Sequence, residues 1–284
     1  LYSMLFELSH SYQSKRNSIT TALYHRIMDS IENTPKLFPQ APMVACQGVE
    51  GAYSQIACEK IFKNPFIMYF KNFDAVFNAI DQGLCQYGIL PIENSTAGSV
   101  STVYDLILKH RFYIVGALDM PIEHCLAALR QSTLEDIEIV WSHPQALAQC
   151  ESYIASHNLT PVPKANTAVA ARDTAKEKRL NVAAICSPNA AREYGLQILD
   201  TGLQDNAYNT TRFIVISKQL YIAPDANKIS LCFSLPHVEG SLYGLLCRFN
   251  SLGLNLTKIE SRPSAERKFE YIFYLDFTGS VRDN

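Results

Sequence analysis

The sequence lacks the features that mark several large classes of protein. Its 25 Lys and Arg residues nearly balance its 27 Asp and Glu residues, so it has no basic excess of the kind that binds nucleic acid. No apolar run approaches the roughly 20 residues of a membrane helix, and no basic segment followed by an apolar one marks a secretory signal. We therefore expect a soluble cytoplasmic protein with no nucleic-acid or membrane partner.

The eight cysteines lie far apart and form neither a C-x-x-C pair nor, together with histidines, a zinc-binding pattern. We predict free thiols in a reducing compartment, with no metal and no other cofactor. The cysteines are Cys46, Cys58, Cys85, Cys125, Cys150, Cys186, Cys232 and Cys247.

A chain of 284 residues exceeds the usual size of a single hydrophobic core, so at least two domains are expected. Apolar residues recur at helical spacing through residues 1–31, and three prolines then mark residues 35–42 as a linker. One amphipathic helix cannot bury its apolar face alone. We therefore expect residues 1–34 to pack on helices absent from this chain or on a partner.

Residues 43–217 alternate short β-rich runs with amphipathic stretches, which predicts α/β layers with largely parallel sheets. The predicted strands are Met43–Cys46, Phe66–Phe70, Tyr87–Ile92, Phe112–Leu118, Glu138–Trp141, Val182–Cys186 and Phe213–Ile216. The predicted helices are Ser54–Phe62, Phe73–Gln82, Ser99–His110, Pro144–His157 and Thr167–Glu177.

A further strand-like run, His124–Leu129, follows closely on the strand that ends at Leu118. We expect the chain to cross there into a second lobe and to return near residues 200–210. The first lobe would then comprise about residues 43–118 and 203–220, and the second about residues 119–202. A cleft between two such lobes is a common place for a small-molecule site.

From Lys228 the pattern changes to strand Ile229–Leu235, helix Ser241–Asn250, and strands Asn255–Ser261 and Phe269–Phe277. This β-α-β-β order is of the ferredoxin-like kind. Because a second helix and a last strand would complete that fold, we expect residues 228–284 to form an incomplete unit.

Two polar runs join a predicted strand to a predicted helix. In the run from Gly48 to Ser54, the glycines would allow a ligand to approach the backbone, but glycines there also serve ordinary turns. The run from Pro91 to Ser99 crowds more hydroxyl and amide side chains at a helix start than capping requires, which favours a ligand-binding role.

Three other motifs have structural as well as functional interpretations. His143, in the run Ser142–Gln145, is a possible acid or base, but we favour a capping role beside Pro144. In the run from Asn209 to Phe213, an arginine that can bind a carboxylate accompanies threonines that would also suit an ordinary strand start. The run from Gly253 to Pro263 also fits the exposed strand end of a ferredoxin-like module.

Taken together, the runs PIENSTAGS, TTRF and ESRP resemble the prephenate dehydratase family from about residue 43 to the end. The resemblance implies a two-lobed catalytic domain, similar to type II periplasmic binding proteins, at 43–220. It also implies an ACT regulatory domain at 228–284, truncated at its C-terminus. One departure is the run Ala183–Ser187, where Cys186 replaces the family's usual alanine.

The resemblance also assigns roles to particular residues. Thr211 would be catalytic. The substrate would contact Tyr53, Ser54, Asn94, Ser95, Thr96, Gly98, Ser99 and Arg212. Phenylalanine, as an allosteric effector in a homodimer or tetramer, would contact His237, Gly240, Ser241, Leu242, Asn255, Leu256, Glu260, Ser261, Arg262 and Pro263. Residues 1–34 resemble the last helix of an AroQ-type chorismate mutase, with Ser9 and Gln13 as remnants of its substrate site.

The implied reaction removes carbon dioxide and water from prephenate to form phenylpyruvate, a precursor of phenylalanine. We expect Thr211 to donate a hydrogen bond to the leaving hydroxyl, with Ser95 or a water completing a relay. The helix start at 94–99 and Arg212 would hold the pyruvyl carboxylate. Two alternatives stay open from the sequence: an arogenate dehydratase, and a non-catalytic sensor of small anions or amino acids.

Overall fold

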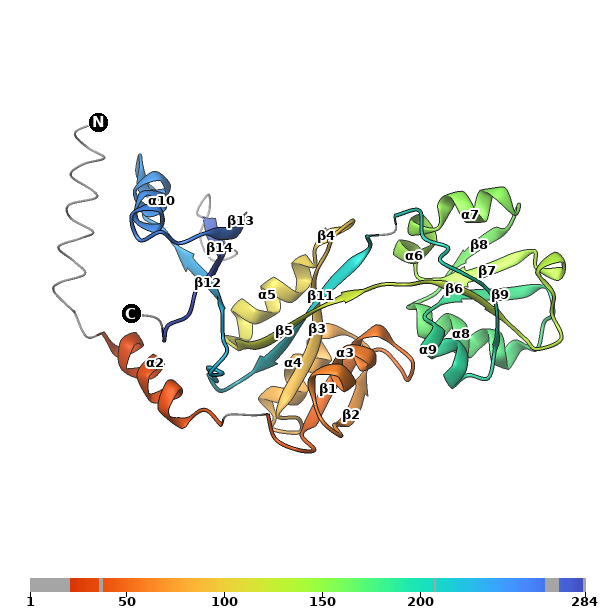
Figure 1. Ribbon diagram of the computed structural model, residues 1–284, viewed down its shortest axis with the longest axis horizontal. Helices are drawn as coiled ribbons and strands as arrows, with labels where there is room; N and C mark the ends of the chain where they lie inside the picture. Colours follow the sequence, from red (N-terminus) through yellow and green to blue (C-terminus); the bar gives the residue numbers. More distant parts are fainter. Residues whose placement is uncertain (1–20, 36–37, 207, 264–270, 283–284) are drawn as a thin grey trace. The chain divides into compact units, whose positions relative to one another are not determined.

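The computed structural model describes residues 21–35, 38–206, 208–263 and 271–282. They divide into two compact units. The central unit consists of residues 38–220, and the terminal unit consists of the described residues on either side of it (Figure 1).

The first lobe of the central unit is built on a six-stranded sheet in the order β2-β1-β3-β11-β5, with β4 paired to β3. β1 runs parallel to β2 and β3, whereas β11 runs antiparallel to both β3 and β5. The strands are β1 (Met43–Gln47), β2 (Phe66–Phe70), β3 (Tyr87–Asn94), β4 (Gly98–Ser99), β5 (Tyr113–Pro121) and β11 (Thr210–Ser217). The helices are α3 (Tyr53–Ile61), α4 (Phe73–Asp81) and α5 (Ser101–His110).

The second lobe has a five-stranded sheet in the order β10-β6-β9-β7-β8. Its strands are β6 (Cys125–Ala128), β7 (Ile139–Ser142), β8 (Thr160–Pro163), β9 (Val182–Cys186) and β10 (Gln197–Thr201). Its helices are α6 (Pro144–Gln149), α7 (Glu151–Ser156), α8 (Thr167–Glu177) and α9 (Pro188–Glu193), with a 3₁₀ turn at Leu134–Asp136. Buried alanines on α8 and α9 let these helices pack closely on the sheet.

The expectation of largely parallel sheets was wrong, because both sheets are mixed. In the second lobe β7 runs parallel to β8 and β9, but β6 runs antiparallel to β9 and β10. The expected helix 144–157 is interrupted at Cys150, which leaves helical geometry with φ −119° and ψ 25°. The helix expected from Ser99 begins at Ser101 instead, because Gly98 and Ser99 pair with β3 as a short strand.

The chain passes between the lobes twice, from β5 to β6 and from β10 to β11. β5 and β11 pair from Thr210 opposite Pro121 to Ser217 opposite Tyr113. Beyond the end of that ladder, the backbone N–H of Ile122 donates to the Asn209 carbonyl over 2.8 Å. The first residues of β11 therefore lie where the two lobes meet.

The terminal unit contains an antiparallel sheet in the order β12-β14-β13, with α10 between the first two strands in the chain. This β-α-β-β order agrees with the prediction, and its core contains Phe249, Leu275 and Phe277. Its elements are α2 (Ala22–Asn33), β12 (Lys228–Ser234), α10 (Ser241–Ser251), β13 (Leu256–Pro263) and β14 (Tyr271–Thr278). Among the described residues, no helix is both long enough and apolar enough to cross a bilayer.

Candidate active site

Asn94 and Thr211 are cross-strand partners at the junction of the lobes. Asn94 is the last residue of β3, Thr211 is the second residue of β11, and the two strands pair at these positions. Both side chains are nearly buried, and Nδ2 of Asn94 lies 2.9 Å from Oγ1 of Thr211. Oδ1 of Asn94 accepts the backbone N–H groups of Thr96 at 3.1 Å and Ala97 at 3.0 Å. The amide thus shapes the turn between β3 and β4.

These contacts fix the direction of the hydrogen bond to Thr211. Backbone N–H groups can only donate, so the oxygen of the Asn94 amide must face Thr96 and Ala97. Its nitrogen therefore faces Thr211 and donates to Oγ1. The hydroxyl hydrogen of Thr211 is left to donate to another group, which is the state required of a donor to a leaving oxygen.

Gln149, at the end of α6, links this pair to the second lobe. Its Nε2 donates to Oγ1 of Thr96 over 3.0 Å, and its Oε1 accepts from Nδ2 of Asn209 over 3.0 Å. The amide of Asn209 in turn accepts from Asn94 over 2.8 Å. Side chains from both lobes and from the approach to β11 thereby form one connected network.

His124 and Tyr53 extend the network at the start of the second lobe. Nε2 of His124 lies 3.2 Å from Oε1 of Gln149, and the Tyr53 hydroxyl lies 3.1 Å from Nδ1 of His124. Tyr53 also donates to the carbonyl of Glu123 over 2.6 Å. Burial lowers the pKa of His124, which the hydrogen bond to Gln149 partly offsets, and burial raises the pKa of Tyr53 well above its usual value. The cluster is therefore polar but uncharged near neutral pH.

Several predicted substrate contacts serve the turns around the cluster. Ser95 donates to the carbonyl of Tyr208 over 3.0 Å and accepts the backbone N–H of Thr210 over 2.9 Å. Ser54 donates to the carbonyl of Gln47 over 2.6 Å. Gly98 has φ +78° in the tight connection, and Ser99 pairs with Glu93. The expected helix start at 94–99 was wrong, because these residues form a turn and a short strand, and anion binding by them stays a prediction.

Arg212 lies outside the cluster. Successive side chains of a strand point to opposite faces, so Arg212 leaves β11 on the face away from Thr211. Its Nε and Nη2 bind the two carboxylate oxygens of Asp119 at 2.7 and 2.9 Å, and Nη1 lies 3.4 Å from Glu93. Arg212 thus makes ion pairs across three strands, and its expected contact with the substrate stays a prediction.

The run Ser142–Gln145 has the structural role that the sequence favoured. His143 is the N-cap of α6, and its Nδ1 accepts the backbone N–H of Gln145 over 3.2 Å. The buried hydroxyl of Ser142 donates to the carbonyl of Ile185 over 2.6 Å and so ties β7 to β9. Pro144 occupies the first turn of α6, where a missing N–H costs nothing.

The terminal unit brings some of the predicted effector residues to one cavity of about 140 Å³. Its lining consists of Leu235, Pro236, His237, Val238, Ser241, Leu242, Tyr271 and Phe273. Gly240, with φ +78°, is the N-cap of α10 beside this cavity. The cavity lining does not include the other six predicted residues: Asn255, Leu256, Glu260, Ser261, Arg262 and Pro263. Ser9 and Gln13 lie outside the described residues.

Gln149 and His124 belong to the site, although the sequence does not single them out. Neither belongs to a run of polar residues, and each becomes notable only because the second lobe meets the first at this point. A weak signal existed for Gln149, which stands one helical turn after Gln145 in the SHPQ run and faces the same way.

Two α/β lobes with mixed sheets, joined by two connections and meeting at a polar cluster, define a two-lobed α/β protein with a candidate site at the junction of the lobes. The sequence pattern of the family described as Prephenate dehydratase matches residues 44–220. The chain belongs to the prephenate dehydratase family, a family of hydro-lyases.

Two similar proteins carry dehydratase names, and a third is described as an acylase. "Arogenate dehydratase/prephenate dehydratase 2, chloroplastic" of Arabidopsis thaliana is 38% identical over 271 residues, which cover 91% of this chain and 70% of that protein. The structure of a prephenate dehydratase from Arthrobacter aurescens in complex with L-Phe is 29% identical, with a TM-score of 0.78, and the match covers 85% of this chain and 82% of that chain. A structure described as "GqqA- a novel type of quorum quenching acylases" is 31% identical, with a TM-score of 0.77, and the match covers 84% and 88%.

The names of these similar proteins affect two expectations, the activity and the cellular location. Because one similar fold is described as an acylase, the activity has to be argued from the site and not from the fold. The Arabidopsis relative is named as chloroplastic, so the cytoplasmic location expected from the sequence finds no support there.

Proposed function

We propose that the chain is a prephenate dehydratase, which converts prephenate to phenylpyruvate with loss of carbon dioxide and water on the route to phenylalanine. The observation that carries this proposal is the oriented hydroxyl of Thr211. Asn94 occupies its acceptor side, so its hydrogen is available for the leaving hydroxyl of the substrate.

The neutral character of the cluster suits this reaction. The substrate's ring carboxylate must leave as carbon dioxide, so a cation held tightly against it would stabilise the ground state and slow the reaction. A donor to the departing hydroxyl stabilises charge that develops only in the transition state, and one such donor contributes roughly 3 kcal/mol. Threonine is too weak an acid to give up its proton fully, and Ser95 already donates to Tyr208. Water is therefore our candidate for the final proton transfer.

Arogenate is the rival substrate, because it differs from prephenate only in carrying an amino group in place of the side-chain keto group. The Arabidopsis relative is named for both activities. Incubation of the purified chain with each substrate, with separate detection of phenylpyruvate and phenylalanine, decides between them. Faster turnover of prephenate supports the proposal, and turnover of neither substrate contradicts it.

Two variants test the role of Thr211 in the same assay. Thr211→Val keeps the shape of the side chain but removes the hydroxyl, and we expect turnover to fall about 10²–10³-fold. Thr211→Ser keeps a donor and should retain more activity than the valine variant. Near-normal turnover by folded Thr211→Val protein would rule out the assigned role.

We further propose that the terminal unit is an ACT domain that binds phenylalanine between subunits of a homodimer or tetramer. The cavity that includes His237, Ser241 and Leu242 supports this proposal. The similarity to the prephenate dehydratase structure in complex with L-Phe also supports it, because that match covers 85% of the chain and so extends beyond the central unit. A coupling of about 1–3 kcal/mol between effector and substrate is typical. Turnover that does not change with added phenylalanine would argue against it.

The N-terminal segment carries a separate proposal. We propose that residues 1–34 correspond to the last helix of an AroQ-type chorismate mutase, with Ser9 and Gln13 as residues of its substrate site.

A further inference from the structure

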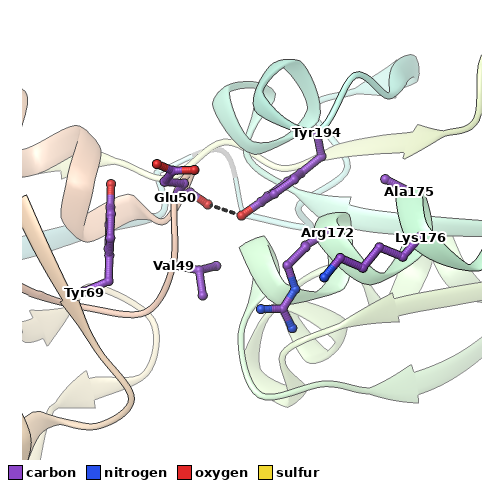
Figure 2. A pocket seen from close by; sticks show the side chains of 7 residues that line it. All are labelled: Val49, Glu50, Tyr69, Arg172, Ala175, Lys176 and Tyr194. Carbon is purple, nitrogen blue, oxygen red and sulfur yellow. Dashed lines mark hydrogen bonds between the residues drawn. The ribbon is translucent and has the colours of Figure 1, made fainter.

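A cavity of about 490 Å³ lies between the two lobes of the central unit (Figure 2). The first lobe contributes Val49, Glu50 and Tyr69, and the second contributes Arg172, Ala175, Lys176 and Tyr194. The lobes touch beside it, where the Tyr194 hydroxyl donates to the Glu50 carbonyl over 2.8 Å. The loop that supplies Val49 and Glu50 leads to Tyr53 of the polar cluster, so a short stretch of chain connects the cavity wall with the cluster.

Two basic side chains make the second-lobe wall of this cavity positively charged. Arg172 and Lys176 are one helical turn apart on α8, and Figure 2 shows their nitrogen atoms directed toward the first lobe. Nε and Nη2 of Arg172 bind one oxygen of Asp173 at 3.1 and 3.0 Å. Glu50 is the acidic residue of the lining, and its carboxylate in Figure 2 points away from both cations.

A dicarboxylate substrate needs positive charge that the polar cluster does not provide. Asn94, Thr211 and Gln149 are neutral side chains, burial disfavours the charged form of His124, and Arg212 is bound to Asp119. A cation in direct contact with the reacting carboxylate would also oppose its loss. Positive charge that contacts a part of the substrate away from the reacting carboxylate avoids that cost.

We propose that Arg172 and Lys176 capture a carboxylate of the anionic substrate in the cavity between the lobes. The inference rests on the proposed function for its ligand, and it concerns binding and not the chemical step. An anion held there would lie between the α8 wall of the second lobe and the Val49–Glu50 loop of the first.

The only tryptophan of the chain offers a binding signal that does not depend on turnover. Nζ of Lys164 lies 3.7 Å from the centre of the Trp141 ring and 3.6 Å from Oδ2 of Asp173, the same carboxylate that binds Arg172. An anion that competes for Arg172 changes the charge balance at Asp173 and Lys164. Binding in the cavity should therefore change the fluorescence of Trp141.

The test compares two double variants with the same change in charge. Arg172→Gln/Lys176→Gln removes the cavity cations, whereas Lys109→Gln/Lys218→Gln removes two exposed cations that do not line the cavity. We expect the cavity variant to raise KM for prephenate by roughly 10-fold or more, the loss expected from one charge-assisted hydrogen bond, with kcat nearly unchanged. Its kcat/KM should also depend less on salt than that of the control variant. Arg172→Lys/Lys176→Arg, which keeps both charges, should stay close to wild type.

The outcomes separate this inference from the proposed function. Wild-type protein that does not turn over prephenate contradicts the function, and titration of Trp141 fluorescence with prephenate then tests the capture site alone. A folded cavity variant with wild-type KM, salt dependence and fluorescence titration overturns the inference while leaving the function intact. If the double variant does not fold, the two single variants are measured in the same way.

Discussion

Asn94 holds Thr211 through a hydrogen bond of 2.9 Å whose direction is set by the backbone of the adjoining turn. The amide oxygen of Asn94 is committed to the N–H groups of Thr96 and Ala97, and its nitrogen is therefore committed to Thr211. The β3–β4 turn therefore helps to determine where the hydroxyl hydrogen of Thr211 points.

Asn94→Asp tests this relationship because it changes one atom of the side chain. The aspartate can still accept the N–H groups of Thr96 and Ala97, but an oxygen now replaces the nitrogen that donated to Thr211. Thr211 would then donate to the aspartate instead of to the substrate. We expect kcat to fall about 10²-fold or more, as for a lost transition-state donor.

Asn94→Leu is the matched comparison for stability. It leaves both turn amides without their acceptor, and one unsatisfied buried group costs about 1–3 kcal/mol. Urea unfolding should therefore show a larger loss for the leucine variant than for the aspartate variant. An aspartate variant with wild-type kcat would show that the direction of the Asn94–Thr211 bond is not important for turnover.

Gln149→Glu should break the link between the lobes. Nε2 of Gln149 donates to Thr96, whose hydroxyl in turn donates to Asn94 over 2.7 Å. A glutamate oxygen at that position would face an oxygen with no hydrogen to offer, in a part-buried site. We expect kcat/KM to fall roughly 100-fold, because two groups of the network lose their partners.

The control for that variant is Gln145→Glu, an exposed position on the same helix with the same change in charge. It should leave the kinetics near wild type. Equal effects of the two substitutions on kcat/KM would indicate a general effect of negative charge on α6 and not a loss of the network.

His124 should make stability depend on pH on the acid side. Burial holds its pKa in the folded protein below the ordinary value of 6.5, so the unfolded chain binds this proton more readily. The neutral histidine contributes its full stability above about pH 6.5, and this contribution is lost as pH falls through the lowered pKa. The free energy of unfolding should therefore decrease between about pH 7.5 and about pH 5.5.

The variant that isolates this effect is His124→Gln, which retains a donor for Gln149 but does not titrate. Burial also lowers the pKa of His143, and that contribution remains in both proteins. Urea unfolding at both pH values should show a smaller decrease for the variant. Identical pH dependence would mean that His124 does not control acid stability.

The sequence predicted most of the strands because their apolar runs are long enough to show a period. It did not predict the strand direction in either sheet, since β11 and β6 reverse relative to neighbours that are distant in the chain. β8 was missed because it contains Pro161 and Pro163 and lies at the edge of its sheet, where proline is tolerated.

The candidate site was likewise predicted only in part from the sequence. Asn94 and Thr211 stood in polar runs beside apolar strands, so their types and positions gave a signal. Nothing in the run 94–99 distinguished a helix start from a turn, because that choice depends on which amides the Asn94 oxygen accepts. Gln149 contacts the site only because the second lobe packs against the first, and no local sequence pattern predicts that packing.

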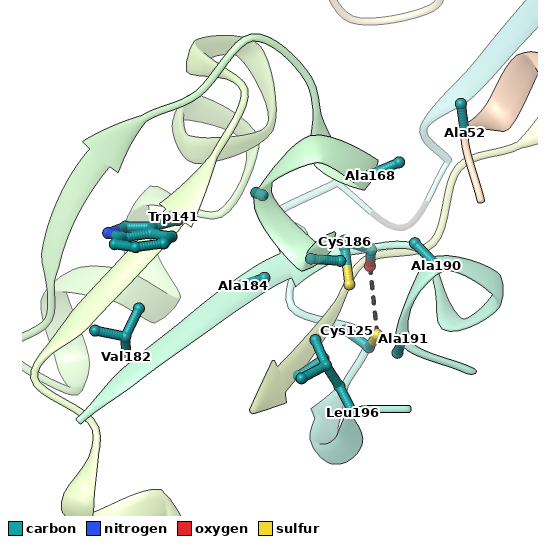
Figure 3. Packing of buried hydrophobic residues seen from close by; sticks show 13 residues of the cluster. Ala52, Cys125, Trp141, Ala168, Val182, Ala184, Cys186, Ala190, Ala191 and Leu196 are labelled. Carbon is teal, nitrogen blue, oxygen red and sulfur yellow. Dashed lines mark hydrogen bonds between the residues drawn. The ribbon is translucent and has the colours of Figure 1, made fainter. Parts of the chain in front are cut away.

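Gly51 lies where the two lobes pack closely together, and its substitution tests whether that packing is needed for activity. A Cβ at Gly51 would lie 2.8 Å from Cα of Ala190, and the Gly51 carbonyl accepts the buried hydroxyl of Ser187 over 3.1 Å. The next residue, Ala52, packs into the buried cluster of the second lobe (Figure 3). Gly51→Ala should therefore hold the lobes apart, and we expect kcat/KM to fall about 10-fold or more because the network needs both lobes.

Gly83→Ala separates this contact from backbone strain. Gly83 has φ +75°, close to the +81° of Gly51, but an added Cβ there meets no atom within 4 Å. Both alanine variants should lose about 1–2 kcal/mol of stability from the left-handed conformation, as measured by urea unfolding. Only Gly51→Ala should also lose activity. If the two variants keep equal kcat/KM, the approach of Gly51 to Ala190 does not position the lobes for turnover.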